Sequence, residues 1–129
     1  MGFYHVCTIQ LGLSLTPHEP SALKVVRKIN VRSVFLGCKY AITQFLAQDR
    51  HASGHRGWII NTASMLGLVG LKPGAGAYCA SKGAVVLLTK QIAVEYGLDN
   101  IHCNALCPGC KSSFASASSC LSLSIDPPL

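Results

Sequence analysis

The chain has 129 residues, 50% of them hydrophobic, which is enough for one domain with its own core and too short for two. Eleven Lys and Arg against five Asp and Glu give a formal net charge of +6. The basic residues form no run longer than Arg27-Lys28, which favours an ordinary basic surface over a nucleic-acid site. No apolar run approaches the ~20 residues that span a bilayer, so a membrane partner is not expected.

The cysteines do not form a recognisable disulfide or metal pattern. Seven is an odd number, and no convincing signal peptide precedes them, so we expect a soluble cytoplasmic protein with reduced thiols. Among His102, Cys103, Cys107 and Cys110, only the last two have the close spacing of a zinc site. Cys103 also lies within an apolar run, where a thiol usually acts as a small hydrophobe. No metal site is predicted.

One long helix dominates the predicted first part of the chain. Residues 1–15 are an atypical segment, in which residues 3–11 could form a strand. An amphipathic helix is predicted over residues 21–48, after the capping-box form of residues 16–19, and residues 49–57 indicate a polar loop. The apolar positions at helical spacing are Val25, Ile29, Val34 or Phe35, Cys38, Ile42, Phe45 and Leu46.

The second part of the chain alternates strands with a helix. Residues 58–62 form a short apolar run without clean alternation, typical of a strand covered on both faces of a parallel sheet. The glycine-rich residues 63–77 predict a loop, and residues 77–96 predict a helix with Gly97 as its C-terminal stop. A second strand is predicted over residues 101–106. The apolar positions of the helix are Ala80, Ala84, Leu87, Leu88, Ile92 and Val94.

The order helix, strand, helix, strand contains one βαβ unit. Such a unit joins parallel strands through a crossover, so the sequence predicts an α/β fold. The second strand ends at Pro108-Gly109. The serine-rich tail over residues 111–129 shows no periodic core face and is expected to be irregular.

Three polar side chains are predicted to meet at the end of the first buried strand. Tyr78 and Lys82 are four residues apart, so they share one helix face. Ser64 follows the strand, and the carboxyl ends of strands are where open α/β sheets bind ligands. An ammonium ~4 Å from the phenol would favour its ionised form by ~4 kcal/mol at an effective dielectric of ~20, and so lower its pKa. Ser64 would hydrogen-bond a substrate oxygen.

Four segments carry a pattern beyond these three residues. They are Asn30-Val31-Arg32-Ser33-Val34-Phe35, Ile59-Ile60-Asn61-Thr62-Ala63-Ser64, Tyr78-Cys79-Ala80-Ser81-Lys82-Gly83-Ala84 and Asn104-Ala105-Leu106-Cys107-Pro108-Gly109. In type, order and approximate spacing they resemble the short-chain dehydrogenase/reductase family, over roughly residues 16–110. The resemblance implies a Rossmann-like, doubly wound parallel sheet, and hydride transfer between NAD or NADP and an alcohol/carbonyl substrate.

The resemblance also implies a role for each matching residue. Tyr78 would be the proton donor or acceptor, and Ser64 would orient the reacting hydroxyl or carbonyl. Lys82 would lower the pKa of the tyrosine and bind the nicotinamide ribose. Asn30 would hold a water in the proton relay, and the Pro108-Gly109 turn would lie beside the nicotinamide. Taken alone, Asn30 equally fits a polar helix position, and Pro108-Gly109 fits a turn that ends a strand.

Both ends of the chain differ from the family pattern. No Gly-x-x-x-Gly-x-Gly or Gly-x-Gly-x-x-Gly loop for the cofactor phosphates precedes the catalytic segments, so the cofactor-binding half is expected to be largely missing. The interval from Ser64 to Tyr78 is one residue longer than is usual in the family, and Lys72 looks like the insertion. We therefore expect an atypical segment over residues 1–15, a partial catalytic region over 16–110, and an irregular tail.

Three functions stay open at this point. The first is an NAD(P)-dependent oxidoreductase, active or descended from an active one. The second is a non-catalytic fragment that forms homo- or hetero-oligomers through the two long helices. The third is a fragment that does not fold stably, because missing strands leave sheet edges and apolar helix faces exposed.

Overall fold

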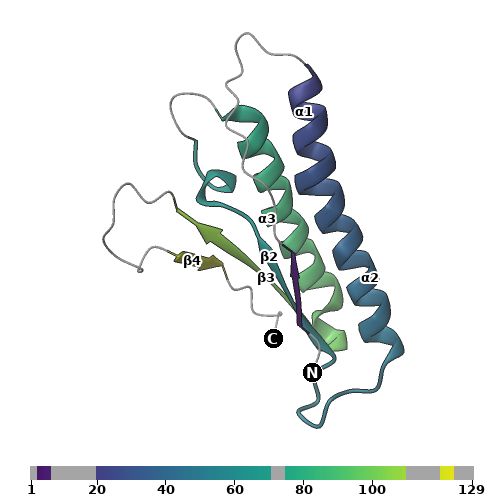
Figure 1. Cartoon of the computed structure of the whole chain (residues 1–129). Helices are drawn as coiled ribbons and strands as arrows, with labels where there is room; N and C mark the ends of the chain where they lie inside the picture. Colours follow the sequence, from purple (N-terminus) through teal and green to yellow (C-terminus); the bar gives the residue numbers. More distant parts are fainter. Residues whose placement is uncertain (1–2, 7–19, 71–74, 110–119, 124–129) are drawn as a thin grey trace.

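Long helices and a small sheet make up the part of the chain that the computed structural model describes, which is residues 3–6, 20–70, 75–109 and 120–123 (Figure 1). In chain order the elements are β1 (Phe3–Val6), α1 (Pro20–Val26), the π-helical η1 (Arg27–Arg32), α2 (Ser33–Ala47), β2 (Gly57–Thr62), the 3-10 helix η2 (Met65–Gly67), α3 (Gly76–Tyr96), the 3-10 helix η3 (Gly97–Asp99), β3 (Ile101–Pro108) and β4 (Cys120–Leu123).

The described strands form one sheet in the order β1-β2-β3-β4. β1 pairs with β2 and β2 pairs with β3 in parallel, with Ile59 opposite Cys103 and Asn61 opposite Ala105. β4 runs antiparallel to β3. The predicted βαβ unit is therefore present as β2, α3 and β3, and the α/β fold class is confirmed.

The two ends of the chain supply the outer strands of this sheet. The strand predicted over residues 3–11 is present at β1, and residues 7–11 lie outside the described part. The expectation of an irregular tail is wrong for residues 120–123, because β4 pairs with Ala105–Pro108 of β3. A strand ladder is made by backbone groups, so a serine-rich composition without periodicity does not reveal it. The rest of the tail lies outside the described residues.

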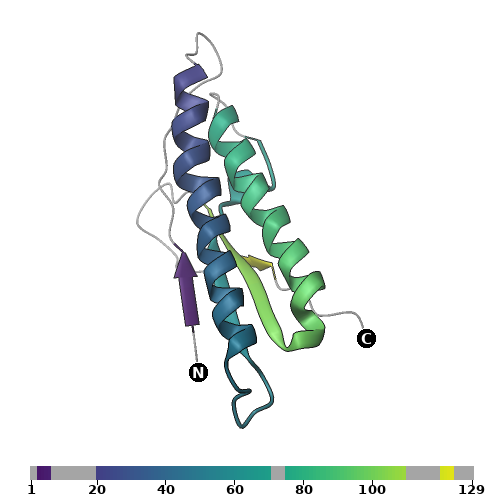
Figure 2. The same cartoon turned by 90° about the vertical axis from the view of Figure 1, so that its right-hand side faces the viewer.

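Both the α1-η1-α2 helix and α3 lie on one face of the sheet (Figure 2). Along β2, Ile59 and Asn61 are buried, whereas Trp58, Ile60 and Thr62 are half-buried, and β3 has the same alternation. Of the two faces of β2 that the sequence predicted to be covered, one is buried and the other is covered only in part. The sequence hides the alternation because the half-buried positions carry apolar side chains as well.

The helix predicted over residues 21–48 is present as α1, η1 and α2, but its middle is π-helical. Val26, Asn30 and Val34 follow one another in four-residue steps, and all three are buried. In an α-helix such steps drift by ~40° around the axis, and the wider turn of a π-helix takes up part of this drift. The structure thus buries Val26 and Asn30 where a uniform period predicts Val25 and Ile29.

Arg56, in the loop after α2, hydrogen-bonds to the C-terminal end of that helix. Its Nη1 donates to the carbonyl oxygen of Gln48 at 2.8 Å, and the Gln48 Nε2 donates back to the carbonyl oxygen of Arg56 at 2.8 Å. The last carbonyls of a helix lack intrahelical donors, and a cation there also suits the helix dipole. The loop predicted over residues 49–57 is in this way tied back to α2.

α3 matches the predicted helix but buries a different face. Of the predicted apolar positions Ile92 is buried, whereas Leu87 and Val94 are exposed. The buried face includes the polar residues Lys82 and Thr89, which hydrogen-bond to partners on β2. Hydrophobic periodicity ranks positions by side-chain polarity, so it misses a face whose polar groups find buried partners.

α3 ends at Tyr96 with Gly97 as its C-cap, as predicted. Gly97 has ordinary right-handed helical angles, however, and the 3-10 turn η3 follows it. The left-handed residue is Asn100, with φ of 60°, and its backbone N–H donates to the carbonyl oxygen of Gly97 at 3.0 Å. Asparagine tolerates this region better than other residues with a side chain, so it can end a helix as glycine does.

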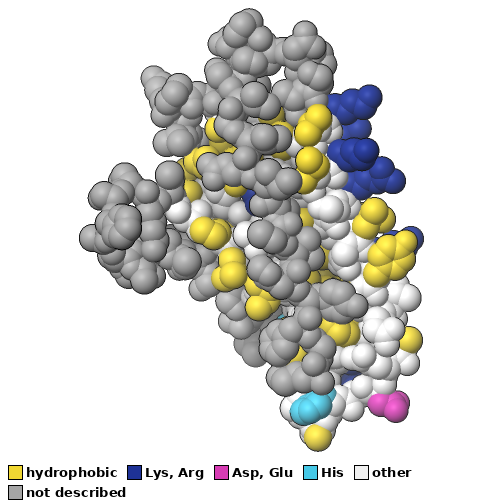
Figure 3. Space-filling view, in the orientation of Figure 1, with side chains coloured by type: hydrophobic (Ala, Val, Ile, Leu, Met, Phe, Trp, Pro, Cys, Tyr) yellow, Lys and Arg dark blue, Asp and Glu magenta, His cyan; other side chains and the backbone are white. Residues whose placement is uncertain are grey.

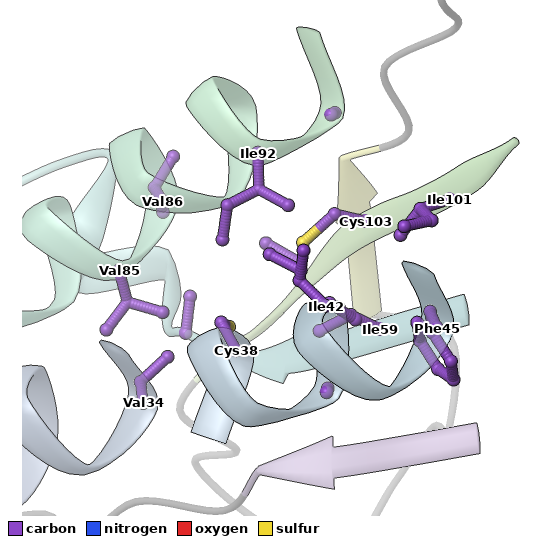
Figure 4. Packing of buried hydrophobic residues seen from close by; sticks show 14 of the residues in the cluster. Val34, Cys38, Ile42, Phe45, Ile59, Val85, Val86, Ile92, Ile101 and Cys103 are labelled. Atoms are coloured by element: carbon purple, nitrogen blue, oxygen red, sulfur yellow. The ribbon is translucent and has the colours of Figure 1, made fainter. Parts of the chain in front are cut away.

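The main core lies between the helices and the buried face of the sheet (Figure 4). The predicted core positions Cys38, Ile42 and Phe45 are confirmed as buried, and Cys103 is a buried thiol in a strand, as expected. The cluster consists of Val34, Cys38, Ala41, Ile42, Phe45, Ile59, Ala63, Val85, Val86, Ile92, Ala93, Ile101, Cys103, Ala105 and Cys107.

A histidine pair on the other face of the sheet makes stability depend on pH. The His102 Nε2 lies 2.9 Å from the His55 Nδ1, and the His102 ring stacks on Trp58 with 5.5 Å between ring centres. Burial, and next the charge of His55, lower the pKa of His102 below its ordinary value. The folded state then binds fewer protons than the unfolded state, so this stabilisation is present above about pH 6.5 and lost as pH falls through the folded pKa.

We therefore expect the wild-type chain to lose thermal stability between about pH 7 and about pH 5, and His102→Gln to lose less over that interval. Thermal melts followed by circular dichroism at several pH values measure this. His51→Gln is the matched control, because His51 is exposed in the loop and contacts Ser53 instead. Equal pH dependence in wild type and His102→Gln would contradict the assignment.

Candidate active site

Ser64 lies just beyond the carboxyl end of β2. Its backbone is extended, and its Oγ accepts a hydrogen bond from the backbone N–H of Leu66 at 3.2 Å, which caps η2. The side chain is buried. A serine is suited to this position because its hydroxyl satisfies one of the free N–H groups of a helix start. The predicted glycine-rich loop therefore begins with a short helix that fixes the serine.

Tyr78 lies in the first turn of α3 and packs against Leu66 and Ala75. Burial raises the pKa of its phenol above the ordinary value, and the charge of Cys79 raises it further. A hydrogen bond with the Ser64 side chain lowers the pKa and offsets part of this. The net direction is upward, so the phenol is held in its protonated form at neutral pH.

Lys82 is one helical turn from Tyr78, as the spacing predicts, and its side chain is only 1% exposed. Its Nζ donates to the carbonyl oxygen of Thr62 at 2.8 Å and lies 5.6 Å from the centre of the Tyr78 ring. The pKa of Tyr78 is raised in this arrangement, because burial of the phenol outweighs the lowering effect of Ser64. A lowering of that pKa by Lys82 stays a prediction.

Asn30 reaches the same region from η1. It is 1% exposed, and its Nδ2 donates to the Ser81 Oγ at 3.1 Å. The Ser81 Oγ in turn donates to the carbonyl oxygen of Tyr78 at 2.8 Å. The Asn30 Oδ1 is buried and has no hydrogen-bond partner among the described residues. The π-helical turn therefore places Asn30 against the turn of α3 that carries Tyr78, and the Asn30 Oδ1 stays available as an acceptor.

Pro108 and Gly109 lie at the carboxyl end of β3, which runs parallel to β2 and so ends at the same edge of the sheet as Ser64. Cys107, the residue before them, contacts the backbone of Ser64, and the Lys82 charge acts on its thiol. Burial still raises the pKa of Cys107, although both of these groups lower it. The end of β3 is thus beside the serine and the lysine.

Sequence reasoning missed two residues that hold this region together. The Asn61 Nδ2 donates to the Thr89 Oγ1 at 3.0 Å and its Oδ1 accepts from the Cys38 Sγ at 3.5 Å, so it joins β2 to both helices. At Gly67 a Cβ would lie 2.8 Å from the Lys82 carbonyl carbon and oxygen. Asn61 could have been found from the sequence, because it is a polar residue within a predicted apolar strand. The close approach of η2 to α3 at Gly67 could not, because no sequence spacing indicates it.

The chemistry of these groups suits an oxygen-bearing substrate and the sugar end of a cofactor. The Ser64 hydroxyl acts on the pKa of the Tyr78 phenol, so the two groups lie near each other and can both bind one substrate oxygen. The buried Lys82 ammonium is a donor, and the Asn30 Oδ1 is an unsatisfied acceptor. Sugar hydroxyls are donors and acceptors at once, so the residues present fit a nicotinamide ribose.

Comparison with known proteins identifies the lineage. The model of the family described as short chain dehydrogenase matches residues 12–120, which is most of the chain. The chain belongs to the short-chain dehydrogenase family. The resemblance carried by the four sequence segments is confirmed.

Curated relatives of this short-chain dehydrogenase are similar to it over part of its length. The 2-(R)-hydroxypropyl-CoM dehydrogenase of Xanthobacter autotrophicus is 46% identical over 84 residues, which are 65% of this chain and 31% of that protein. The cyclopentanol dehydrogenase of a Comamonas species is 49% identical over 82 residues, which are 64% of this chain and 30% of that protein. The chain spans less than a third of the length of these relatives.

Solved structures agree with the partial Rossmann-like fold. A gluconate 5-dehydrogenase from Burkholderia cenocepacia, in complex with NADP and tartrate, gives a TM-score of 0.72 at 29% identity, over 83% of this chain and 40% of that one. A 4-hydroxyisoleucine dehydrogenase complexed with NADH and succinate gives a TM-score of 0.74 at 28% identity, over 88% of this chain and 52% of that one.

Proposed function

We propose that this chain carries the acid/base half of an NAD(P)-dependent oxidoreductase that interconverts an alcohol and a carbonyl compound. The observation that carries the proposal is the placement of the Tyr78 phenol near the Ser64 hydroxyl and the buried Lys82, at the carboxyl end of β2. Family membership supports it. We assign this function to residues 16–110.

Each residue has a task that suits its position. The raised pKa of Tyr78 keeps its phenol protonated, which suits a proton donor to a carbonyl oxygen. Ser64 would hydrogen-bond the same oxygen as its charge changes. The Lys82 ammonium, 5.6 Å from the ring centre, would stabilise the phenolate after the proton has left. The nicotinamide cofactor, when bound, supplies or accepts the hydride.

The remaining predicted residues would hold the surroundings of this reaction. Asn30 would place a water through its unsatisfied Oδ1, and Lys82 would bind the nicotinamide ribose. Pro108 and Gly109 end β3 at the edge where the nicotinamide would lie. The names of the hydroxypropyl-CoM and cyclopentanol dehydrogenases each refer to a compound with a hydroxyl group, which supports a small alcohol or carbonyl compound as substrate. Free thiols at all four cysteines with described side chains support a cytoplasmic location.

The test is hydride transfer by the 129-residue chain, at high concentrations of NAD(H) or NADP(H), with a set of secondary alcohols and ketones. We expect turnover that Tyr78→Phe lowers by about 100-fold or more, because the variant keeps the ring but loses the hydroxyl that carries the transferred proton. Tyr40→Phe is the matched control, since Tyr40 is exposed on α2. Cofactor fluorescence should report similar affinity in both variants.

Two outcomes would count against this proposal. Turnover that survives Tyr78→Phe would contradict the role of the tyrosine. An absence of turnover in the wild-type chain, at cofactor concentrations that saturate any binding, would favour the second candidate function.

The second candidate is an oligomerisation fragment that pairs through α2 and α3. A groove of about 390 Å³ runs between these helices, and its apolar lining includes Phe35 and Leu46, both largely exposed. Lys39 on α2 and Glu95 on α3 line the same groove. A two-fold axis brings the same patch of two copies together, so it could pair each lysine with the glutamate of the other copy. A second copy of this chain, or a longer relative, is the proposed partner.

We expect Leu46→Glu to raise the dissociation constant of the dimer by about tenfold or more, because it places a charge in an apolar contact. Analytical ultracentrifugation over a range of concentrations measures this. Leu98→Glu is the control: Leu98 is 85% exposed and does not line the groove. A wild-type chain that is monomeric at all concentrations would exclude this candidate.

A further inference from the structure

The helix that begins at Pro20 carries an unusual distribution of charge. Residues 20–48 hold five Lys and Arg, and no Asp or Glu. Four of them lie on α1 and η1: Lys24 precedes Arg27 by three residues and Lys28 by four, and Arg32 follows Lys28 by four. Residues at these spacings are neighbours on a helix surface. We call these four residues the basic stripe. Figure 3 shows them as one dark blue group along the outer edge of the helix.

The fold brings no described acidic side chain into the basic stripe. The acidic residues of the described ranges are Asp49, Glu95 and Asp99, which follow the end of α2 or lie at the end of α3. In Figure 3 the acidic group is at the opposite end of the molecule from the stripe. Like charges at four-residue spacing, such as Lys24 with Lys28, destabilise a helix. Helix stability therefore does not account for the stripe, whereas a negatively charged partner would.

Exposed apolar side chains flank the basic stripe on its two sides. Leu23 is 52% exposed and precedes Arg27 by one turn, and Val25 is 46% exposed and precedes Lys28 by three residues. The buried face of this helix starts at Val26 instead. A phosphodiester backbone offers contacts for the cations only. The surface of a bilayer with anionic lipids offers headgroup charges for the cations and an acyl boundary for the leucine and valine.

We propose that the basic stripe, with Leu23 and Val25, docks this protein on the surface of an anionic lipid bilayer. None of the helices in the described ranges is long and apolar enough to cross a membrane. The cations would contact the phosphates and carboxylates of the lipid headgroups. The side chains of Leu23 and Val25 would enter the boundary between headgroups and acyl chains. The sequence predicted no membrane partner, because its apolar runs are short and its basic residues form no run longer than two.

The test is co-sedimentation of the full chain with phosphatidylcholine vesicles, with and without phosphatidylserine. We expect binding only to the vesicles with phosphatidylserine, and a decrease with salt. Lys24→Gln with Lys28→Gln should weaken binding about 30-fold, since each cation near such a surface contributes about fivefold. The matched control is Arg50→Gln with Lys90→Gln, which removes the same charge from exposed positions outside the stripe.

The outcomes separate a bilayer from other partners. An equal loss in the control pair would overturn the proposal, because net charge alone would then explain binding. Leu23→Ser with Val25→Ser should also weaken vesicle binding, and unchanged binding would overturn the bilayer as the partner. Fluorescence anisotropy with a short DNA duplex tests the nucleic-acid alternative: binding of DNA through the stripe without binding of vesicles would overturn the proposal in favour of that alternative.

Discussion

Phe45→Ala is expected to lower the free energy of unfolding by about 3–5 kcal/mol. The ring is 1% exposed and fills the space between α2 and β2, so truncation removes buried apolar surface and leaves a cavity. Small domains are stable by about 5–15 kcal/mol, so much of this chain would be unfolded. Urea denaturation followed by circular dichroism measures the change.

The matched control for Phe45→Ala is Tyr40→Ala on the same helix. Tyr40 is 64% exposed and contacts the Lys39 ammonium at 5.8 Å from its ring centre, an interaction worth about 1 kcal/mol or less at an exposed site. Similar losses in the two variants would show that Phe45 is not a core residue.

The contact between Phe45 and Gly57 provides an independent check of the same packing. A Cβ at Gly57 would lie 2.3–2.5 Å from three carbons of the Phe45 ring, so Gly57→Ala should cost about 1–3 kcal/mol by overpacking. In the Phe45→Ala background the added methyl would enter the cavity and should cost little or restore stability. Strictly additive effects in this double-mutant cycle would contradict the contact.

Gly67→Ala is expected to have the second large effect, about 1–3 kcal/mol of destabilisation. The added Cβ would lie 2.8 Å from the Lys82 carbonyl carbon and oxygen and 3.0 Å from the Gly83 backbone nitrogen. These are backbone atoms of a helix and cannot turn aside as a flexible side chain does. η2 would therefore move away from α3. Gly70→Ala is the matched control, because nothing lies within 4 Å of a Cβ there.

The same substitution should also alter the site. Moving η2 away from α3 would separate the Ser64 hydroxyl from the Tyr78 phenol, and loss of that hydrogen bond would raise the pKa of Tyr78 further. A spectrophotometric titration of the tyrosines, with Tyr78→Phe as the reference for the Tyr78 signal, measures this shift. An unchanged Tyr78 titration together with unchanged stability would show that Gly67 is not needed for the approach.

Much of the secondary structure could be predicted because it depends on local sequence. Apolar spacing over many residues indicated both long helices, and the short apolar runs indicated β2 and β3. β4 could not be found this way, since its four residues form a strand through pairing with β3. The π turn was also missed, because one wider turn changes the phase of a helix without a characteristic residue type.

The candidate site was predictable in its members and less so in its contacts. Tyr78 and Lys82 follow from helix geometry, and Ser64 follows from its position after a strand. The bridge from Asn30 through Ser81 to the Tyr78 carbonyl joins residues 51 positions apart, and no local pattern reports such a contact. The catalytic assignment of these residues stays a proposal that turnover measurements test.

The sequence by itself determined the order of the elements and the residues from which the site is built, because helix and strand periods are set by backbone geometry. Only the tertiary structure decided which helix faces are buried and in which direction the pKa of Tyr78 is shifted. Burial depends on segments far apart in the chain. The charged state of a phenol follows from that burial, so it could not be predicted from the spacing of a tyrosine and a lysine.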